Sequence, residues 1–163
     1  MDLELTGKVA IVTGGSDGIG KAAATSLARE AAKVAIVGRT QAKLDAGIAE
    51  SKGETGGDVM GVAADVSVES DVQAMVAKVV EEFGGVDILV NNAGTSSATT
   101  LELMTDDDLK VDFGIKIYGA IYCARAVLPY LKASGTGAII NTTTPGGKAS
   151  GPGAQPTSLS RAA

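Results

Sequence analysis

A glycine-rich turn near the N-terminus has the residue types and spacing of a phosphate-binding site. Residues 13–20, TGGSDGIG, follow a short β-branched run. Gly14 permits a sharp exit from a strand, and Gly18 lacks a Cβ, so a pyrophosphate can reach the free N–H groups at a helix start. Gly20 lets that helix pack closely on the sheet. The alternative is an ordinary strand-to-helix turn. We expect a dinucleotide to contact Gly14, Ser16, Asp17, Gly18, Ile19 and Gly20.

A basic residue follows the second predicted strand, where such sites distinguish NAD from NADP. Proteins that prefer NAD place a carboxylate there to bond the ribose hydroxyls. This sequence has Gly38 and then Arg39 and Thr40, and a guanidinium is well matched to a 2′-phosphate. The alternative is a solvated arginine at a helix start. We expect Arg39 and Thr40 to contact NADP(H), which should be preferred over NAD(H).

Composition excludes several other kinds of function. The 163 residues carry a formal net charge of −5, which disfavours a nucleic-acid surface, and they include no histidine for Ser-His-Asp chemistry. Cys123 is the single cysteine and is expected to be a small core residue. The acidic N-terminus does not resemble a signal peptide, and no apolar run is long enough to span a bilayer. We expect a cytoplasmic protein with no metal, nucleic-acid or membrane partner.

Alternating strand and helix patterns would position the glycine turn. Short apolar runs predict strands over 9–13, 34–37, 59–63, 86–90 and 138–141. Helices are predicted over 18–31, 41–52, 70–83 and most of 106–132, with a glycine-rich turn at 53–58. Repeated β-α-β units predict an α/β fold, a doubly wound, Rossmann-like parallel sheet in the order 3-2-1-4-5. We expect one dinucleotide-binding domain over residues 1–163.

Two of these helices have a predicted buried face. Ile19, Ala23, Leu27 and Ala31 share a helical repeat in the first helix, and Val72, Val76, Val79 and Val80 share one in the third. Ser70 or a neighbour is expected to cap the third helix.

With Asp65 after the third strand and Asn91-Asn92-Ala93-Gly94 after the fourth, the glycine turn resembles that of the short-chain dehydrogenase/reductase family. The resemblance covers essentially the whole chain and implies an NAD(P)(H)-dependent oxidoreductase acting on a small alcohol or carbonyl. It implies that Asp65, with Val66 beside it, holds the adenine, and that Asn92, Ala93 and Gly94 line the ribose. Asn91 would brace the central strands. In NADP-dependent relatives the place of Asp17 is often basic, which counts against NADP here.

The catalytic positions of that family are all substituted in this chain. The family uses Asn, Ser, Tyr and Lys, with Tyr as the proton donor or acceptor. Matching its motifs places Lys116 at the Asn, Thr144 at the Ser, Thr157 at the Tyr and Arg161 at the Lys. Thr144 keeps a hydroxyl, and Arg161 keeps a positive charge but cannot shuttle protons.

The loss of the phenol leaves the source of the proton open. The Thr157 hydroxyl is far too weak an acid to replace a phenol. Lys116 is an alternative donor, unless it snorkels to the surface from a packed helix. Tyr118, Tyr122 and Tyr130 are more simply explained by core or interface packing. Both an oxidoreductase with an altered site and a non-catalytic NADP(H)-binding sensor or assembly subunit therefore stay open.

The resemblance also bears on assembly. The family continues beyond the position of Ala163 with a helix, strands and a substrate-binding loop. We expect the sequence to be incomplete at its C-terminus, or a partner to cover the last strand, and we expect a homo-oligomer.

Overall fold

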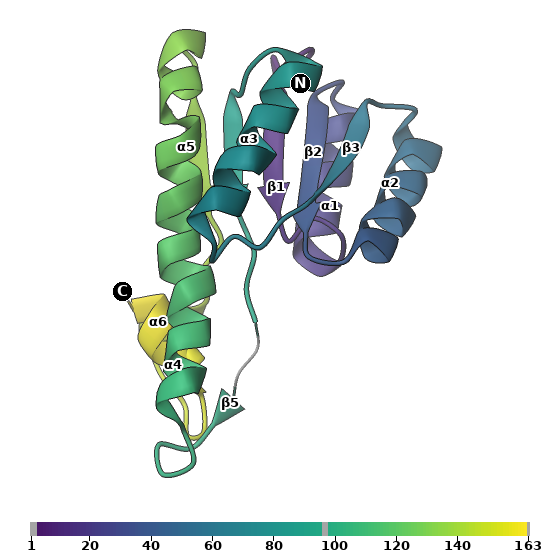
Figure 1. Cartoon of the computed structure of the whole chain (residues 1–163). Helices are drawn as coiled ribbons and strands as arrows, with labels where there is room; N and C mark the ends of the chain where they lie inside the picture. Colours follow the sequence, from purple (N-terminus) through teal and green to yellow (C-terminus); the bar gives the residue numbers. More distant parts are fainter. Residues whose placement is uncertain (1–2, 96–97, 163) are drawn as a thin grey trace.

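A parallel sheet of five strands in the order β3-β2-β1-β4-β6 lies at the centre of the molecule (Figure 1). The computed structural model describes residues 3–95 and 98–162. The strands are β1 (Val9–Thr13), β2 (Lys33–Gly38), β3 (Val59–Ala63), β4 (Ile88–Asn91) and β6 (Ala138–Asn141). The predicted α/β sheet in the order 3-2-1-4-5 is confirmed, with β6 as its fifth strand. Parallel pairing brings the carboxyl ends of β1, β2, β4 and β6 to one edge of the sheet.

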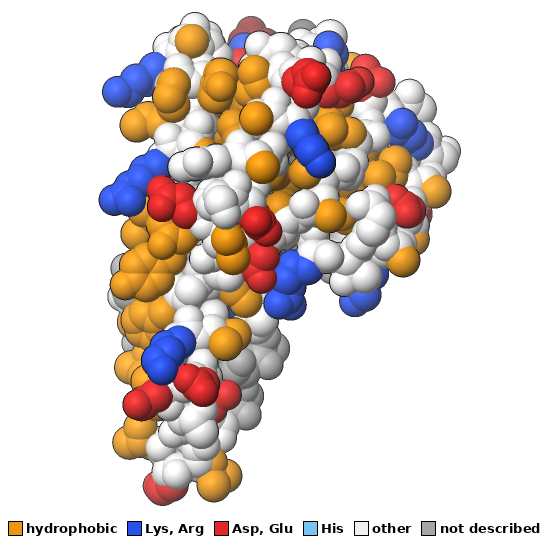
Figure 2. All heavy atoms as spheres, in the orientation of Figure 1, with side chains coloured by type: hydrophobic (Ala, Val, Ile, Leu, Met, Phe, Trp, Pro, Cys, Tyr) orange, Lys and Arg blue, Asp and Glu red, His pale blue; other side chains and the backbone are white. Residues whose placement is uncertain are grey.

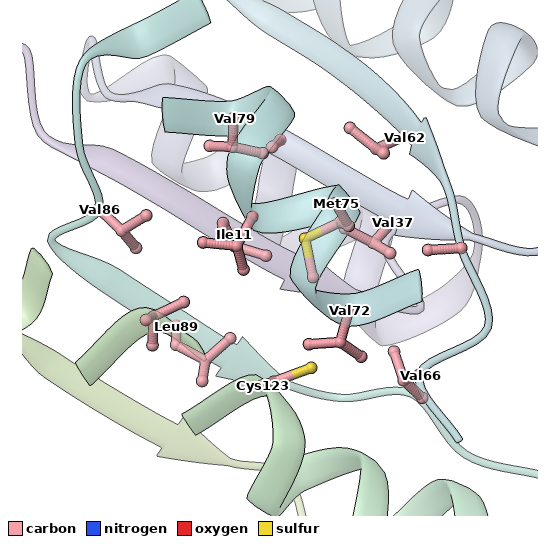
Figure 3. Close-up of a cluster of buried hydrophobic side chains, with 14 of the residues drawn as sticks. Ile11, Val37, Val62, Val66, Val72, Met75, Val79, Val86, Leu89 and Cys123 are labelled. Atoms are coloured by element: carbon pink, nitrogen blue, oxygen red, sulfur yellow. The ribbon is translucent and has the colours of Figure 1, made fainter. Parts of the chain in front are cut away.

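Helices cover both faces of the sheet and enclose two cores. The elements are α1 (Gly18–Arg29), α2 (Gln41–Thr55), α3 (Glu69–Phe83) and α5 (Gly119–Ser134). One core joins the sheet to α1 and α2 through buried residues that include Ala24, Ala28 and Leu44. The other joins it to α3 and α5; Figure 3 shows Ile11, Val72, Met75, Val79, Leu89 and Cys123 within it.

A long helical rod extends past the carboxyl ends of the strands (Figure 1). It consists of α4 (Asp106–Phe113), a π-helical turn (Gly114–Tyr118) and α5. Thr105 and Asp108 form a capping box at its start, which satisfies free N–H groups of the first turn. A short antiparallel pair, β5 (Ala98–Thr99) with β7 (Gln155–Pro156), and α6 (Thr157–Ala162) lie near its lower end. The π turn matters for the site because it carries Lys116, and such turns occur frequently at functional sites.

Several helix boundaries and faces differ from the sequence prediction. Helix α2 continues through Gly53 and ends at Gly56, whose φ of 65° closes the helix in the left-handed conformation. The expected turn at 53–58 is therefore wrong over its first half. The prediction that Ser70 or a neighbour caps α3 with its side chain is also wrong, because α3 begins at Glu69 and its N-cap residue, Val68, makes no side-chain cap hydrogen bond.

The buried face of α1 also differs from the prediction. Gly20, Ala24 and Ala28 are its buried residues, whereas the predicted Ile19 is 72% exposed. Of the other predicted residues, Leu27 packs partly against the core, and Ala31 lies beyond the end of α1 at Arg29. Small residues face the sheet because the helix lies very close to it, so volume outweighs hydrophobicity in selecting this face. In α3 the prediction is confirmed for Val72, Val76 and Val79, which are buried; Val80 is partly buried against the same core.

Strand β6 forms one edge of the sheet and is exposed along its whole length. Its two isoleucines, Ile139 and Ile140, are 40% and 50% exposed. An exposed apolar edge strand is a template for pairing with another chain, so this edge is where a covering segment or partner is expected.

Candidate cofactor and substrate site

The glycine turn packs tightly against the end of β4. Gly14 has a φ of +65°, and a Cβ there would lie 3.0 Å from both Ala93 Cα and Asn92 Nδ2. A Cβ on Gly20 would lie 2.2 Å from the Gly14 carbonyl oxygen. The contact at Gly20 is shorter than packed atoms tolerate, and the contacts at Gly14 are at the limit of what they tolerate. Gly14 and Gly20 are therefore required by the close approach of backbone to backbone, which agrees with their predicted roles.

Thr13 and Asn92 tie this turn to the neighbouring strand. The Thr13 hydroxyl donates to the Val90 carbonyl (3.2 Å) and accepts from the Asn92 N–H (3.0 Å) and the Ala93 N–H (3.1 Å). The Asn92 side-chain amide donates to the carbonyls of Thr13 (3.2 Å) and Gly14 (3.3 Å). The Asn92 side chain thus fixes the two loops relative to each other, whereas the next residues, Ala93 and Gly94, line the adjoining cavity.

The N-terminus of α1 has an open approach from solvent. Gly18 has a φ of +53°, and a Cβ on it would meet no atom within 4 Å. Beside it the exposed Ile19 forms an apolar surface at the mouth of the turn. The Asp17 carboxylate accepts a hydrogen bond from the Gly18 N–H (2.7 Å), so an incoming phosphate has to displace that bond or use the next N–H groups. The turn fits a pyrophosphate, with Asp17 as its one unfavourable feature.

A cavity of about 250 Å³ brings most of the predicted cofactor residues together. Its lining includes Gly14, Ser16, Arg39, Thr40, Asp65, Val66, Ala93 and Gly94. Asp17, Gly18, Ile19, Gly20 and Asn92 lie around the glycine turn but do not line this cavity. Lys43 lines it as well. Sequence reasoning missed Lys43, although a second basic residue one helical turn after Arg39 was a usable signal.

Asp65 lines this cavity, and its carboxyl group is kept in the ionised form that accepts hydrogen bonds. Burial alone would raise the pKa of its carboxyl, but two hydrogen bonds from Ser67 and the positive charge of Arg39 outweigh burial and lower the pKa below the ordinary value of 3.8. The Ser67 N–H donates at 2.9 Å and its hydroxyl at 2.6 Å, both to the same carboxylate oxygen, Oδ1. An ionised Asp65 can accept from an amino group such as that of adenine.

The second half of the site lies where β4, β6, the π turn and α6 meet. A cavity of about 310 Å³ there is lined by residues that include Asn91, Asn141, Thr142, Lys116 and Arg161. The Asn91 side-chain amide donates to Asn141 Oδ1 (2.9 Å) and to the Ala120 carbonyl (3.4 Å). Asn91 therefore joins β4 to β6 and to α5, the bracing role expected for it.

Lys116 is buried at this junction and paired with an acidic side chain. The Lys116 side chain is 1% exposed and that of Asp112 is 0% exposed, and Lys116 Nζ lies 2.6 Å from Asp112 Oδ1. Lys116 Nζ also donates to the Thr157 hydroxyl at 3.0 Å. The snorkelling alternative for Lys116 is therefore wrong, because the ammonium stays inside and is neutralised by Asp112.

Asp112 accepts hydrogen bonds from three separate segments. Its Oδ1 accepts from the Thr95 hydroxyl (3.1 Å) as well as from Lys116, and its Oδ2 accepts from the Ser160 hydroxyl of α6. Sequence reasoning missed Asp112, Thr95 and Ser160. The spacing of Asp112 and Lys116, four residues apart on a helix, was an available signal for the pair.

Arg161 and Thr144 have different surroundings. The Arg161 guanidinium donates to the Thr142 carbonyl, and its Nε is buried without a partner among the described residues. A Cβ on Gly94 would lie 2.9 Å from Arg161 Nη2, so this side chain reaches the turn that follows β4. The Thr144 hydroxyl instead accepts from the Gly146 N–H (3.2 Å), and Thr144 is exposed and does not line the cavity.

The three tyrosines of the rod lie outside this cluster. Tyr122 and Tyr130 pack partly against the core formed with α3, whereas Tyr118 is 53% exposed. None of the three lines the cavity that Lys116 and Arg161 share.

Comparison with known proteins identifies the family to which this chain belongs. The profile described as short chain dehydrogenase matches residues 8–163, and the chain belongs to that family. It is 38% identical to "Uncharacterized oxidoreductase YvrD" of Bacillus subtilis (strain 168) over 147 residues, which are 90% of this chain and 55% of that protein. It is 35% identical to a 3-oxoacyl-[acyl-carrier-protein] reductase of Synechocystis sp. over 150 residues, which are 91% of this chain and 60% of that one.

Solved structures show the same fold with either cofactor. L-Sorbose reductase from Gluconobacter frateurii, complexed with NADPH and L-sorbose, superposes with a TM-score of 0.95 at 35% identity, covering 99% of this chain and 62% of that one. NAD⁺-bound xylitol dehydrogenase superposes with a TM-score of 0.92 at 30% identity, covering 98% and 61%. The chain thus spans somewhat more than half the length of these relatives. Within residues 3–95 and 98–162, no helix combines the length and apolar character needed to cross a membrane.

Proposed function

We propose that the protein is an NADP(H)-dependent oxidoreductase that acts on an alcohol or carbonyl substrate through an altered catalytic site. The cavity that Arg39 and Lys43 line together with the glycine turn carries this proposal. Its two cations suit a 2′-phosphate, for which Arg can supply a bidentate contact and Lys a point charge. Gly38 precedes them where a carboxylate would repel that phosphate.

Other residues of the site would contact different parts of the cofactor. Asp65 and Val66 would hold the adenine, and the N–H groups from Gly18 onward would receive the pyrophosphate. Ala93 and Gly94 would line a ribose, with the Arg161 guanidinium beside Gly94. The bound nicotinamide would supply or accept a hydride. By the resemblance, Thr144 and Thr157 would stand at the family's Ser and Tyr, which act on the substrate oxygen, and Lys116 would stand at the Asn, which supports a proton-carrying water.

A non-catalytic NADP(H)-binding sensor or assembly subunit is the second candidate. The observation in its favour is Thr157, which stands in place of the family's phenol and cannot act as a comparable acid. Both candidates share the cofactor site, so they differ only in whether hydride leaves the cofactor.

Deuterium transfer separates the two candidates. The protein is incubated with NADPH carrying deuterium at C4 and with a panel of ketones and aldehydes, and products are analysed by mass spectrometry. An oxidoreductase transfers the label to a product alcohol in proportion to protein concentration. Tight NADPH binding without any labelled alcohol would favour the sensor or subunit.

We further propose a homo-oligomer in the cytoplasm. Exposed apolar side chains follow the rod formed by α4 and α5, and Figure 2 shows hydrophobic side chains along it. They include Val111, Tyr118, Ile121 and Leu128. Light scattering coupled to size exclusion should give a mass above that of one chain, and Ile121→Lys with Leu128→Lys should lower it. A monomer at all concentrations would contradict the proposal.

A further inference from the structure

Asp112 is a buried carboxylate that lines neither of the two cavities but is bonded to residues around both. Its side chain is 0% exposed on α4. Among its three partners, Thr95 lines the cavity of about 250 Å³ proposed for the cofactor. Lys116 and Ser160 line the neighbouring cavity of about 310 Å³. Asp112 therefore links the walls of the two cavities without reaching a ligand in either.

The three partners satisfy a charge that water does not reach. A buried carboxylate is costly unless it is paired with a positive charge and hydrogen-bonded. Lys116 Nζ supplies the charge at 2.6 Å from Oδ1, and the Thr95 hydroxyl donates to the same oxygen at 3.1 Å. The Ser160 hydroxyl donates to Oδ2. Loss of Ser160 would leave a buried oxygen unpaired, so we expect the carboxylate to reorient and to weaken its bond to Thr95.

The two ends of this network lie on segments that need outside support. Helix α6 has six residues, too few for a helix to be stable by itself, so its position depends on contacts with the rod. Thr95 follows Ala93 and Gly94, which line the proposed cofactor cavity with it. Since Thr95 and Ser160 donate to the same carboxylate, the position of the turn after β4 depends on the position of α6.

We infer that Asp112 is a positioning residue that couples the two cavities, so that occupation of the cofactor cavity also fixes α6 and the wall of the neighbouring cavity. This rests on the proposed binding of NADP(H). When α6 leaves the rod, Asp112 loses Ser160, and the turn loses its anchor at Thr95. Ala93 and Gly94 would contact the cofactor best with the turn anchored, so binding shifts α6 toward its docked position. The coupling is reciprocal, and docked α6 raises the affinity for NADPH by the same factor.

Hydrogen exchange of the α6 amides, measured by NMR with and without saturating NADPH, tests the coupling. In the parent, NADPH should slow this exchange by about 5- to 150-fold, the usual range for coupled sites. Thr95→Val removes the hydroxyl that bonds Asp112 but leaves the contacts of α6. Exchange without NADPH should therefore match the parent, and NADPH should slow it by no more than about twofold. Thr25→Val, which removes a hydroxyl of α1 that bonds Ser51 away from both cavities, is the matched control and should behave as the parent.

Ser160→Ala cuts the network at its other end. Exchange should be fast with and without NADPH, and NADPH affinity, measured by fluorescence, should fall by at least about fivefold, although Ser160 does not line the proposed cofactor cavity. A purely structural role would change exchange by the same factor in both states and leave affinity unchanged. No slowing in a parent that binds NADPH, parent-like slowing in Thr95→Val, or parent-like affinity in folded Ser160→Ala would overturn the coupling. Failure of the parent to bind NADPH would instead overturn the proposed function.

Discussion

Two basic side chains, Arg39 and Lys43, contribute positive charge to the lining of the proposed cofactor cavity. At the residue scale the proposed cofactor preference depends on them, because they can contact a 2′-phosphate that NAD(H) lacks. Arg39 is exposed, so it can adjust to a ligand at little cost in packing.

Arg39→Ala should therefore weaken NADPH binding by about 10- to 100-fold, the value of a lost hydrogen bond to a charged group. NADH binding should change little, because NADH carries no 2′-phosphate. Fluorescence titration of both reduced cofactors measures this, and Arg125→Ala, which removes an exposed arginine of α5, is the matched control. Equal losses for both cofactors would contradict the assignment.

Asp65 leads to a prediction about how the stability of the fold depends on pH. Because the hydrogen bond from the Ser67 hydroxyl helps to lower the pKa of Asp65, Ser67→Ala, which keeps the backbone N–H bond, should raise that pKa toward 3.8. A carboxyl with a lowered pKa in the folded state adds stability above its unfolded pKa and loses it as pH falls through the folded pKa. Parent and variant should therefore differ in stability at neutral pH and converge in acid. Carbon NMR of the carboxyl and denaturant unfolding across pH test this; a constant difference down to low pH would contradict it.

At the scale of elements, the fit of α1 against the glycine turn decides whether the site forms at all. Gly20→Ala places a methyl 2.2 Å from the Gly14 carbonyl oxygen, so α1 must move away from the sheet. We expect a loss of about 1–3 kcal/mol or more in unfolding free energy. Gly53→Ala is the control, since its Cβ meets nothing within 4 Å inside α2, and it should stabilise by about 0.5–1 kcal/mol. Equal Tm values for the two variants would show that α1 is not closely packed.

Helix α5 gives a second prediction at this scale, through Cys123. Burial raises the pKa of its thiol to about 12, and its side chain lies in the core between the sheet, α3 and α5 (Figure 3). Thiolate is the reactive form, so the native protein should resist Ellman's reagent at pH 8 and react fully only in denaturant. Rapid labelling of the native protein would mean that α5 separates readily from the core.

The elements also show how much of this structure could be predicted from the sequence. The strands and their order could be predicted because short β-branched runs alternate with helical patterns. The tight turn between β1 and α1 could be predicted because its glycines have fixed spacing. The buried face of α1 could not, since close approach favours Gly20 and Ala24 over the larger Ile19. The Asp112 network could not either, because Asp112 and its partner Ser160 are 48 residues apart, and no local pattern marks Ser160 as its partner.

At the scale of the whole molecule, the two cavities lie at the same edge of the sheet, where the carboxyl ends of β1, β2, β4 and β6 meet the rod. Ala93 lines both, so a dinucleotide seated on the glycine turn could pass from Arg39 toward Lys116. Every functional proposal above depends on that seating. It requires an open approach to the N–H groups of α1 at Gly18.

Titration of NADPH into the parent, Gly18→Val and Gly18→Asn tests this most directly. A Cβ on Gly18 meets no protein atom within 4 Å, so the fold should survive, and Asn tolerates the φ of +53° that strains Val. Circular dichroism confirms folding, and fluorescence measures binding. We predict saturable binding to the parent and a loss of at least about tenfold in both folded variants, since either side chain blocks the pyrophosphate. Parent-like affinity in folded Gly18→Asn would contradict the account, because the cofactor would then not bind at the glycine turn.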